Sequence, residues 1–167
     1  MDLLNFEGQE LYFDEPLDEK VQGLIAAASE RYAEGAAEMP LLEAYGLAPQ
    51  SLTVLVALYR FYYYQHRLEE AVEISEKALD ITARDLAVPR DFSLLSEMHI
   101  ARAALGSMVK LRFHLLCLKA EGYLLLRLGR EEEGKAILRK LVELDSNNRL
   151  GARQLLEVVE PRLRVVA

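Results

Sequence analysis

The chain has 167 residues, 51% of them hydrophobic, a formal net charge of −7 and one cysteine. This length and apolar content suit a single packed domain that buries roughly 70% of its unfolded surface, which excludes a disordered chain. The acidic balance argues against a nucleic acid partner, and the lone cysteine rules out a disulfide framework, so we expect a cytoplasmic protein.

Residues 1–16 are predicted to form an acidic and apolar N-terminal arm. Residues 1–50 hold 11 acidic side chains against Lys20 and Arg31, which gives this part a charge of −9, whereas the remainder carries +2. Two interpretations of the arm stay open: an ordered cap that covers the first helix, or an arm that docks in the groove of this or another chain. We favour the cap, because termini with this much apolar content usually pack locally.

Two helices are expected within residues 17–50. The first runs from Leu17 to Glu38, opens with acidic residues that suit the helix dipole, and has a buried stripe made of Val21, Leu24, Ile25, Ala28 and Tyr32. Gly35 interrupts this pattern. Pro40 suits the first turn of a short second helix that ends near Gly46.

Residues 51–83 contain a clear pair of helices, with Ser51 as a suitable N-cap. One stripe of the first helix follows the spacing i, i+3, i+4, i+7 and holds Leu55, Leu58, Tyr59 and Tyr62. The segment Gln65-His66-Arg67 breaks this stripe. The second helix has its own stripe, made of Leu68, Ala71, Val72, Ser75, Ala78 and Leu79. The small residues within this stripe let two antiparallel helices approach closely.

Residues 84–107 are predicted to be an insertion. The segment from Ala83 to Phe92 is expected to form a loop, after which Asp91 or Ser93 caps a helix that starts at about Leu94. Gly106-Ser107 either breaks this helix or lies within a helix that runs on to Leu128. We therefore expect a lengthened first helix in the next hairpin.

Residues 108–148 repeat the helical pair. Leu118, Gly122 and Leu125 lie on its first helix, Leu128-Gly129-Arg130 makes the turn, and the second helix holds Gly134, Leu138, Leu141 and Leu144. The interval from Leu118 to Gly134 equals the interval from Leu55 to Ala71. The apolar stripe between Arg149 and Arg164 predicts a C-terminal capping helix.

The two pairs resemble the tetratricopeptide repeat, which places a large residue, Leu-Gly and Tyr on its first helix and Ala, a large residue and Ala on its second. The resemblance, which extends to small bacterial proteins of this family, implies an all-α fold. It would be a TPR-like array of helical hairpins, an α-solenoid with a right-handed superhelix and a C-terminal capping helix. The expected domain covers residues 17–164, with units at about 17–50, 51–83 and 108–148, an insertion at 84–107 and the capping helix at 149–164.

The sequence contains no recognisable catalytic or metal-binding motif. None of the three histidines, His66, His99 and His114, completes the Glu-x-x-His motif of di-iron proteins. His114 and Cys117 are three residues apart, but no second pair of ligands accompanies them for zinc, so we favour a role for these two side chains in packing the core. No glycine-rich phosphate loop or nucleophile elbow occurs. The longest apolar run is far shorter than the ~20 residues that span a bilayer. We therefore expect no enzyme activity, cofactor, metal or membrane insertion.

The resemblance implies that the first helix of each hairpin lines a concave face where partner peptides bind. The candidate binding residues are Val56, Arg60, Tyr63, Tyr64, Lys119, Tyr123, Leu126 and Arg127, with Gln22, Ala26, Ser29 and Glu30 in the first unit. Their cations and tyrosine rings favour a protein segment with carboxylates beside apolar side chains. Alternatively, the tyrosines pack between repeats. At least one of Tyr62, Tyr63 and Tyr64 must face elsewhere, because successive helix positions point about 100° apart.

The predicted function is protein–protein interaction, by an adaptor or chaperone-like protein. Small acidic chains with three such repeats also serve as chaperones for type III secretion translocators, which is one alternative. The stretch from Val54 to Ala71 is similar to small repeat proteins encoded among nitrogen-fixation genes of some bacteria. A second alternative is a self-associating homodimer, in which another copy of the chain fills the groove.

Overall fold

The computed structural model describes residues 16–160, whose helices belong to two compact units that divide between Ala78 and Leu79. Residues 16–160 contain no β-strand, which confirms the all-α class. The elements in chain order are α1 (Glu19–Glu30), the short 3-10 helix η1 (Tyr32–Glu34), α2 (Glu38–Leu47), α3 (Leu52–Tyr64), α4 (Leu68–Leu86), the 3-10 helix η2 (Phe92–Leu94), α5 (Glu97–Arg127), α6 (Glu131–Leu144) and α7 (Ala152–Val159). One domain over residues 17–164 stays a prediction.

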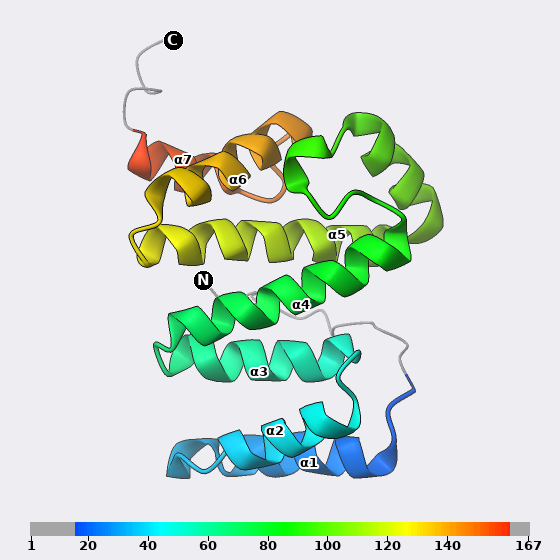
Figure 1. The fold of residues 1–167 in the computed structure, drawn as a ribbon, viewed down its shortest axis with the longest axis vertical. Coiled ribbons are helices and arrows are strands. Elements are labelled where there is room, and N and C mark those ends of the chain that lie inside the picture. Colours follow the sequence, from blue (N-terminus) through cyan, green and yellow to red (C-terminus); the bar gives the residue numbers. More distant parts are fainter. Residues whose placement is uncertain (1–15, 161–167) are drawn as a thin grey trace. The chain divides into compact units, whose positions relative to one another are not determined.

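The first unit contains α1, α2, α3 and the part of α4 up to Ala78. Helix α2 packs against both α1 and α3 (Figure 1). The N-cap Ser51 accepts a hydrogen bond from the backbone N–H of Val54 at 3.3 Å, as predicted. The core is built from almost fully buried side chains of α3, namely Leu52, Val54, Leu55, Leu58 and Tyr59.

Helix α1 is shorter than the sequence predicted. Asp18 caps it by accepting a hydrogen bond from the backbone N–H of Lys20 at 2.8 Å. The helix ends at Glu30 rather than Glu38, because η1 follows and Gly35 then turns the chain with a left-handed φ of 72°. The short second helix with Pro40 in its first turn is confirmed.

The turn that joins α3 to α4 recurs 63 residues later between α5 and α6. His66 and Gly129 occupy the same place and have left-handed φ angles of 57° and 77°. The backbone N–H groups of Arg67 and Arg130 each donate to the carbonyl oxygen five residues earlier, at 2.9 Å. The Nε of each arginine donates to the glutamate three residues later, at 2.8 Å. The two hairpins are therefore repeats in backbone geometry as well as in sequence.

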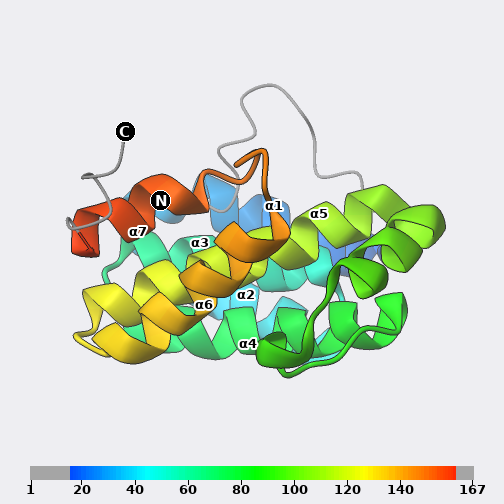
Figure 2. The ribbon, with the colours of Figure 1, turned by 90° about the horizontal axis from the view of Figure 1, so that it is seen from above.

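The second unit contains the end of α4, η2 and helices α5, α6 and α7. Helix α6 contacts both α5 and α7 (Figure 2). A Cβ atom placed on Gly134 of α6 would lie 2.6 Å from the carbonyl oxygen of Gly122 on α5. The small residues thus permit the close helix approach that the sequence predicted. Beside them lies a core of Leu118, Leu124, Leu138 and Leu141.

The insertion contains more helix than expected. Helix α4 continues to Leu86, so the loop that was predicted to start at Ala83 is shorter. The prediction of Asp91 or Ser93 as the cap of the long helix is wrong. Asp91 caps η2, with its carboxylate accepting from the backbone N–H of Ser93 at 2.9 Å, and Ser96 is the N-cap of α5.

Helix α5 is the lengthened helix that the sequence predicted. Its 31 residues run from Glu97 to Arg127. The expected break lies at Ser107, whose φ of −157° and ψ of 101° are not helical. The break and the lengthened helix therefore coexist.

The capping helix α7 occupies Ala152–Val159, within the predicted span of 149–164 but shorter. The helix begins at Ala152 rather than at Arg149, because Arg149 and Leu150 are held in a loop. The carboxylate of Asp145 accepts hydrogen bonds from their backbone N–H groups, at 3.0 and 2.7 Å. Residues 161–164 lie outside the described part of the chain, as does the predicted arm except for Pro16.

Candidate protein-binding groove

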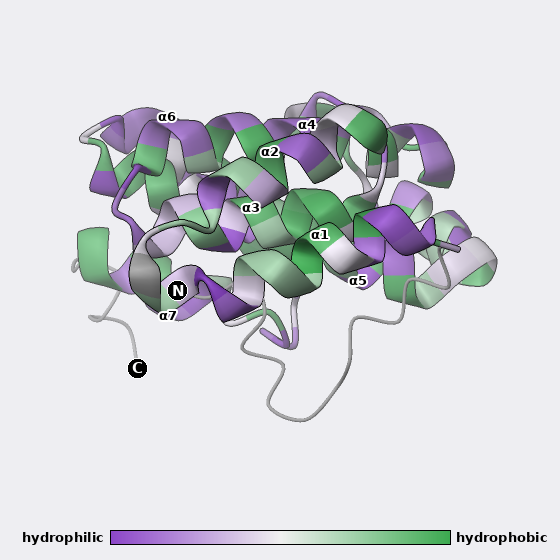
Figure 3. Cartoon of the chain, turned by 90° about the horizontal axis from the view of Figure 1, so that it is seen from below, coloured by the Kyte–Doolittle hydropathy of each residue, from purple (hydrophilic) through white to green (hydrophobic). Residues whose placement is uncertain are grey.

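A groove of about 820 Å³ lies in the first unit, between α1, the start of α2 and α3. Figure 3 colours much of α3 and part of α1 as hydrophobic, and these two helices contribute to the lining. Helix α3 supplies nearly half of the lining, and the remainder comes from α1, η1, α2 and the cap residues Ala37 and Gln65. The lining residues are Ile25, Ala28, Ser29, Tyr32, Ala37, Leu41, Thr53, Val56, Ala57, Arg60, Phe61, Tyr64 and Gln65.

Three of the four residues predicted on α3 line this groove. Val56 is buried, whereas Arg60 and Tyr64 are exposed. Tyr63 is not among the lining residues. Its ring is half-buried and stacks on that of Tyr59, with centroids 6.0 Å apart and planes inclined by 12°.

The run of three tyrosines on α3 faces three different environments. Tyr62 is buried, and the guanidinium of Arg67 lies 4.6 Å from its ring centroid. Burial raises the pKa of Tyr62, with a further contribution from the nearby Glu38. Tyr63 stacks within the unit and Tyr64 reaches the groove. This confirms that the three rings cannot share one surface.

On α1 the groove includes only Ser29 of the four predicted residues. Gln22, Ala26 and Glu30 are exposed but lie outside its lining. The sequence analysis missed Tyr32, which was assigned to the buried stripe yet is 39% exposed. Its ring meets that of Phe61 edge-on at 6.2 Å. Spacing could have indicated Tyr32, because it follows Ser29 by three residues and so continues the same helix face.

The four residues predicted on α5 have different surroundings in the second unit. Lys119 is half-buried, its ammonium donates a hydrogen bond to the carbonyl of Leu150, and burial lowers its pKa. Leu126 lies in the hairpin seam against Gly134. Arg127 is exposed and donates to the hydroxyl of Tyr123 at 2.9 Å, with its guanidinium 5.8 Å from that ring. Only Arg127 and Tyr123 are brought together as a pair.

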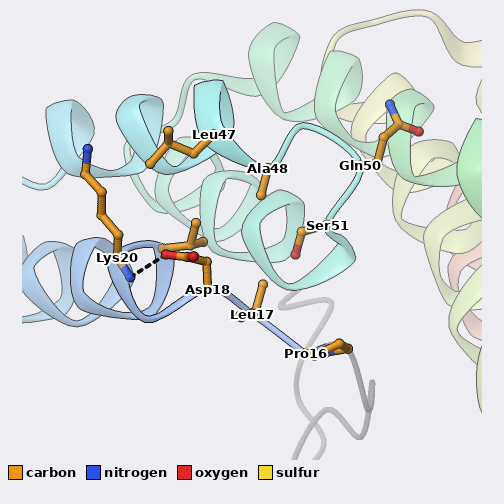
Figure 4. A pocket seen from close by; sticks show the side chains of 9 residues that line it. Pro16, Leu17, Asp18, Lys20, Leu47, Ala48, Gln50 and Ser51 are labelled. Atoms are coloured by element: carbon orange, nitrogen blue, oxygen red, sulfur yellow. Dashed lines mark hydrogen bonds between the residues drawn. The ribbon is translucent and has the colours of Figure 1, made fainter.

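A second cleft, of about 600 Å³, lies where α1 begins and the loop between α2 and α3 passes (Figure 4). It contains none of the predicted binding residues. Its lining is mixed, with the Asp18 carboxylate and the Lys20 ammonium beside aliphatic groups. The lining residues are Pro16, Leu17, Asp18, Lys20, Val21, Leu47, Ala48, Gln50 and Ser51.

Helix α5 also carries buried polar groups, namely His114, Cys117 and Glu121. Nδ1 of His114 lies 2.7 Å from the hydroxyl of Thr82, and burial together with the charge of Arg90 lowers the pKa of His114 to about 4. Burial raises the pKa of the Cys117 thiol, with a further contribution from Glu121. Within residues 16–160, no group of three or more His, Cys, Asp or Glu side chains could hold a metal ion.

The helices between residues 16 and 160 are each too short or too polar to cross a membrane. A family profile for the tetratricopeptide repeat matches residues 120–148, which cover the end of α5 and all of α6. An "Uncharacterized 19.8 kDa protein in nifW 5'region" from Azotobacter chroococcum mcd 1 is 55% identical over 159 residues, covering 95% of this chain and 89% of that protein. No solved structure matches the chain.

Proposed function

Because the chain belongs to the tetratricopeptide repeat family, we propose that it is a protein-binding module that takes a segment of a partner protein into the groove of α1, α2 and α3. Members of this family generally mediate protein interactions and are typically not enzymes. The proposal assigns the chain an adaptor or chaperone-like role, in the cytoplasm, without catalytic activity.

The observation that carries the proposal is the composition of the groove. Arg60 is the charged residue of the lining, and none of the lining residues in the described part of the chain is a carboxylate, although the whole chain has a net charge of −7. Tyr32 and Tyr64 add exposed rings that pack against apolar groups and donate hydrogen bonds. These features favour an acidic side chain next to large apolar ones, in an extended or helical segment.

The pair formed by Tyr123 and Arg127 offers a second contact of the same chemistry on α5. Lys119 and Leu126 contribute to the packing of the second unit, so we assign the partner contact on α5 to the Tyr123 and Arg127 pair.

The relative from Azotobacter chroococcum is named for its place in the 5′ region of nifW. We extend this genetic setting to the present chain as part of the proposal. Proteins encoded by genes next to this one are then the first partners to test. Acidic and apolar segments in them are the expected ligands.

Selection from a library of displayed peptides tests the chemistry of the groove. The wild type is compared with Arg60→Glu and with the matched control Arg149→Glu, which makes the same charge change at an exposed position between α6 and α7. We expect the wild type and Arg149→Glu to enrich peptides with Asp or Glu beside large apolar residues. Arg60→Glu should bind these peptides at least about tenfold more weakly, because it replaces a charge-assisted contact by repulsion.

Circular dichroism must first establish that the three proteins are equally helical. Enrichment of basic peptides, or equal binding of the selected peptides by Arg60→Glu and Arg149→Glu, would contradict the proposed groove. The same proteins can then be titrated with acidic segments from the products of neighbouring genes.

A further inference from the structure

The groove of the first unit and the N-terminal arm have complementary compositions. Residues 1–15 contain five acidic residues and no lysine or arginine. Among the described residues that line the groove, Arg60 is the charged one and none is a carboxylate. The arm therefore has the chemistry that we assign to the partner, because its acidic residues stand next to large apolar ones. These apolar and aromatic residues are Met1, Leu3, Leu4, Phe6, Leu11, Tyr12 and Phe13.

The groove offers a continuous apolar surface to such a segment. Ala28, Leu41 and Val56 are buried in its lining, whereas the rings of Tyr32 and Tyr64 are 39% and 48% exposed. A segment that covers these rings removes apolar surface from water, which stabilises the bound state. The apolar residues of the arm are of the kind that would cover them.

The arm joins the described chain beside one end of the groove. Pro16 and Leu17 line the second cleft together with Ser51, the residue that caps α3 (Figure 4). On α3 the lining of the groove begins at Thr53, two residues after Ser51, and extends to Gln65 at the end of the helix. The arm can therefore enter the groove by following α3 from its start.

The arm is also long enough to fill the groove. The 12 residues from Thr53 to Gln65 correspond to about 18 Å of helix. The 15 residues of the arm reach up to about 50 Å when extended and about 22 Å as a helix. Because the arm is tethered to the unit, its effective concentration at the groove is on the order of millimolar. This favours a segment of the same chain over a second copy as the occupant.

We propose that residues 1–15 occupy the groove of their own chain and thereby regulate its binding of partner proteins. The regulatory part of this inference rests on the proposed function, because the arm and the partner compete for one surface. A partner has to displace the arm, so its apparent affinity falls with the fraction of molecules whose groove is open. An arm that is bound in about 90% of the molecules weakens partner binding by about tenfold.

Binding of the peptides selected from the displayed library tests this competition. The arm variant carries Leu4→Ser, Phe6→Ser, Leu11→Ser and Phe13→Ser. The matched control makes four apolar-to-serine changes at exposed residues of the second unit, namely Leu94→Ser, Met98→Ser, Leu105→Ser and Met108→Ser. Circular dichroism must show that both variants are as helical as the wild type. We expect the arm variant to bind the peptides about tenfold more tightly than the wild type and the control. Equal affinities of the three proteins would overturn the regulatory role.

Alkylation by iodoacetamide tests where the arm lies. Ser29→Cys places a thiol in the lining of the groove, and Ala26→Cys places one at an exposed position of α1 outside the lining. The natural Cys117 is buried, so the new thiols react selectively. The four serine changes in the arm should accelerate alkylation of Ser29→Cys by about 5- to 10-fold and leave Ala26→Cys nearly unchanged. Equal acceleration at both positions would place the arm over α1 outside the groove and would overturn the proposal.

Dilution distinguishes an arm of the same chain from the arm of another copy. Protection of Ser29→Cys should be the same over about 1–100 µM protein, because an intramolecular contact does not depend on concentration. Protection that increases with protein concentration would show that a second copy supplies the arm, which contradicts the proposal.

The two measurements also separate this inference from the proposed function. If the wild type and the arm variant bind the selected peptides equally and Ser29→Cys reacts equally in both backgrounds, the groove binds partners and the inference fails. If the library gives no acidic and apolar peptide even for the arm variant, while the arm protects Ser29→Cys, the arm occupies the groove and the proposed function fails.

Discussion

Replacing Gly134 by alanine should destabilise the hairpin of α5 and α6. The new Cβ atom would lie 2.6 Å from the carbonyl oxygen of Gly122 and 2.9 Å from Cγ of Leu126. The leucine side chain can move, but the carbonyl oxygen belongs to the backbone of the facing helix. The substitution therefore has to push the two helices apart at the point where they lie closest.

The size of the effect follows from two opposing terms. An ordinary contact requires about 3.4 Å, so the helices must separate locally by about 0.8 Å, and overpacking of this kind costs about 1–3 kcal/mol. Alanine is a better helix former than glycine by about 1 kcal/mol. Because the clash involves a backbone atom, we take the upper half of the overpacking range, about 2–3 kcal/mol, and expect a net loss of about 1–2 kcal/mol. Gly122→Ala should cost less, because its Cβ would meet its nearest neighbours at 3.2–3.3 Å.

Native-state hydrogen exchange is the suitable assay, because it reports on α5 and α6 separately from the first unit. Gly134→Ala should accelerate exchange of the globally protected amides of these helices by about 5- to 30-fold. Gly23→Ala is the control, since no atom lies within 4 Å of its Cβ and it should stabilise α1 by about 0.5–1 kcal/mol. Protection in Gly134→Ala at or above the wild-type level would refute the close approach.

Three further predictions concern stability. Burial lowers the pKa of His114 from 6.5 to about 4, so the neutral side chain stabilises the folded state fully above pH 6.5, and this stabilisation is lost as the pH falls towards 4. In urea titrations the free energy of unfolding should therefore fall by about 2 kcal/mol between pH 7 and pH 5, and His114→Asn should abolish this pH dependence. His66→Gly should raise the thermal unfolding midpoint, because glycine adopts the left-handed φ of this position without strain, and the gain should be about 0.5–1 kcal/mol. Gly129→Ala should lower the midpoint for the same reason. Midpoints equal to that of the wild type in both variants would contradict backbone strain at these two turns. Ser51→Ala should cost about 1 kcal/mol by calorimetry and Ser51→Thr much less, because threonine retains the cap.

The hairpins were predictable because their determinants are local. Helix stripes, small seam residues and turn positions recur at a fixed offset, and the turns at His66 and Gly129 share their hydrogen bonds. Ser51 identified its helix start for the same reason, since a hydroxyl just before an apolar stripe can reach the free N–H groups of the first turn.

The start of α5 was not predictable from local chemistry. Asp91, Ser93 and Ser96 are all competent caps within six residues, and nothing in their sequence context ranks them. Burial of Leu95 between two of them fixes the chain there and leaves Ser96 as the first free cap before α5. Tertiary packing therefore decides which of these locally equivalent residues caps α5.

The lining of the groove was predictable only in part. Arg60 and Tyr64 could be identified from their helix face, because that face was given by the hairpin pattern. Ala37 and Leu41 could not, since their place in the lining depends on how α2 packs beside α1 and α3. Tyr63 shares that helix but does not line the groove, because its ring stacks on that of Tyr59, a contact that the helix pattern does not indicate.

The offset of 63 residues also separates structural positions from binding positions. Ala71 of α4 corresponds to Gly134 of α6, and both are small and buried; at Gly134 the seam between the helices leaves no room for a larger side chain. On the first helices, Arg60 corresponds to Tyr123 and Tyr64 to Arg127.

Each hairpin thus carries an arginine and a tyrosine one turn apart, in opposite order. This reversal keeps the chemistry of the surface while changing its direction along the helix, which packing inside the hairpin does not require. If these positions bind a partner, exchanging Arg60 and Tyr64 for each other should alter which peptides bind and leave the unfolding midpoint almost unchanged, whereas substitutions in the seam should do the reverse.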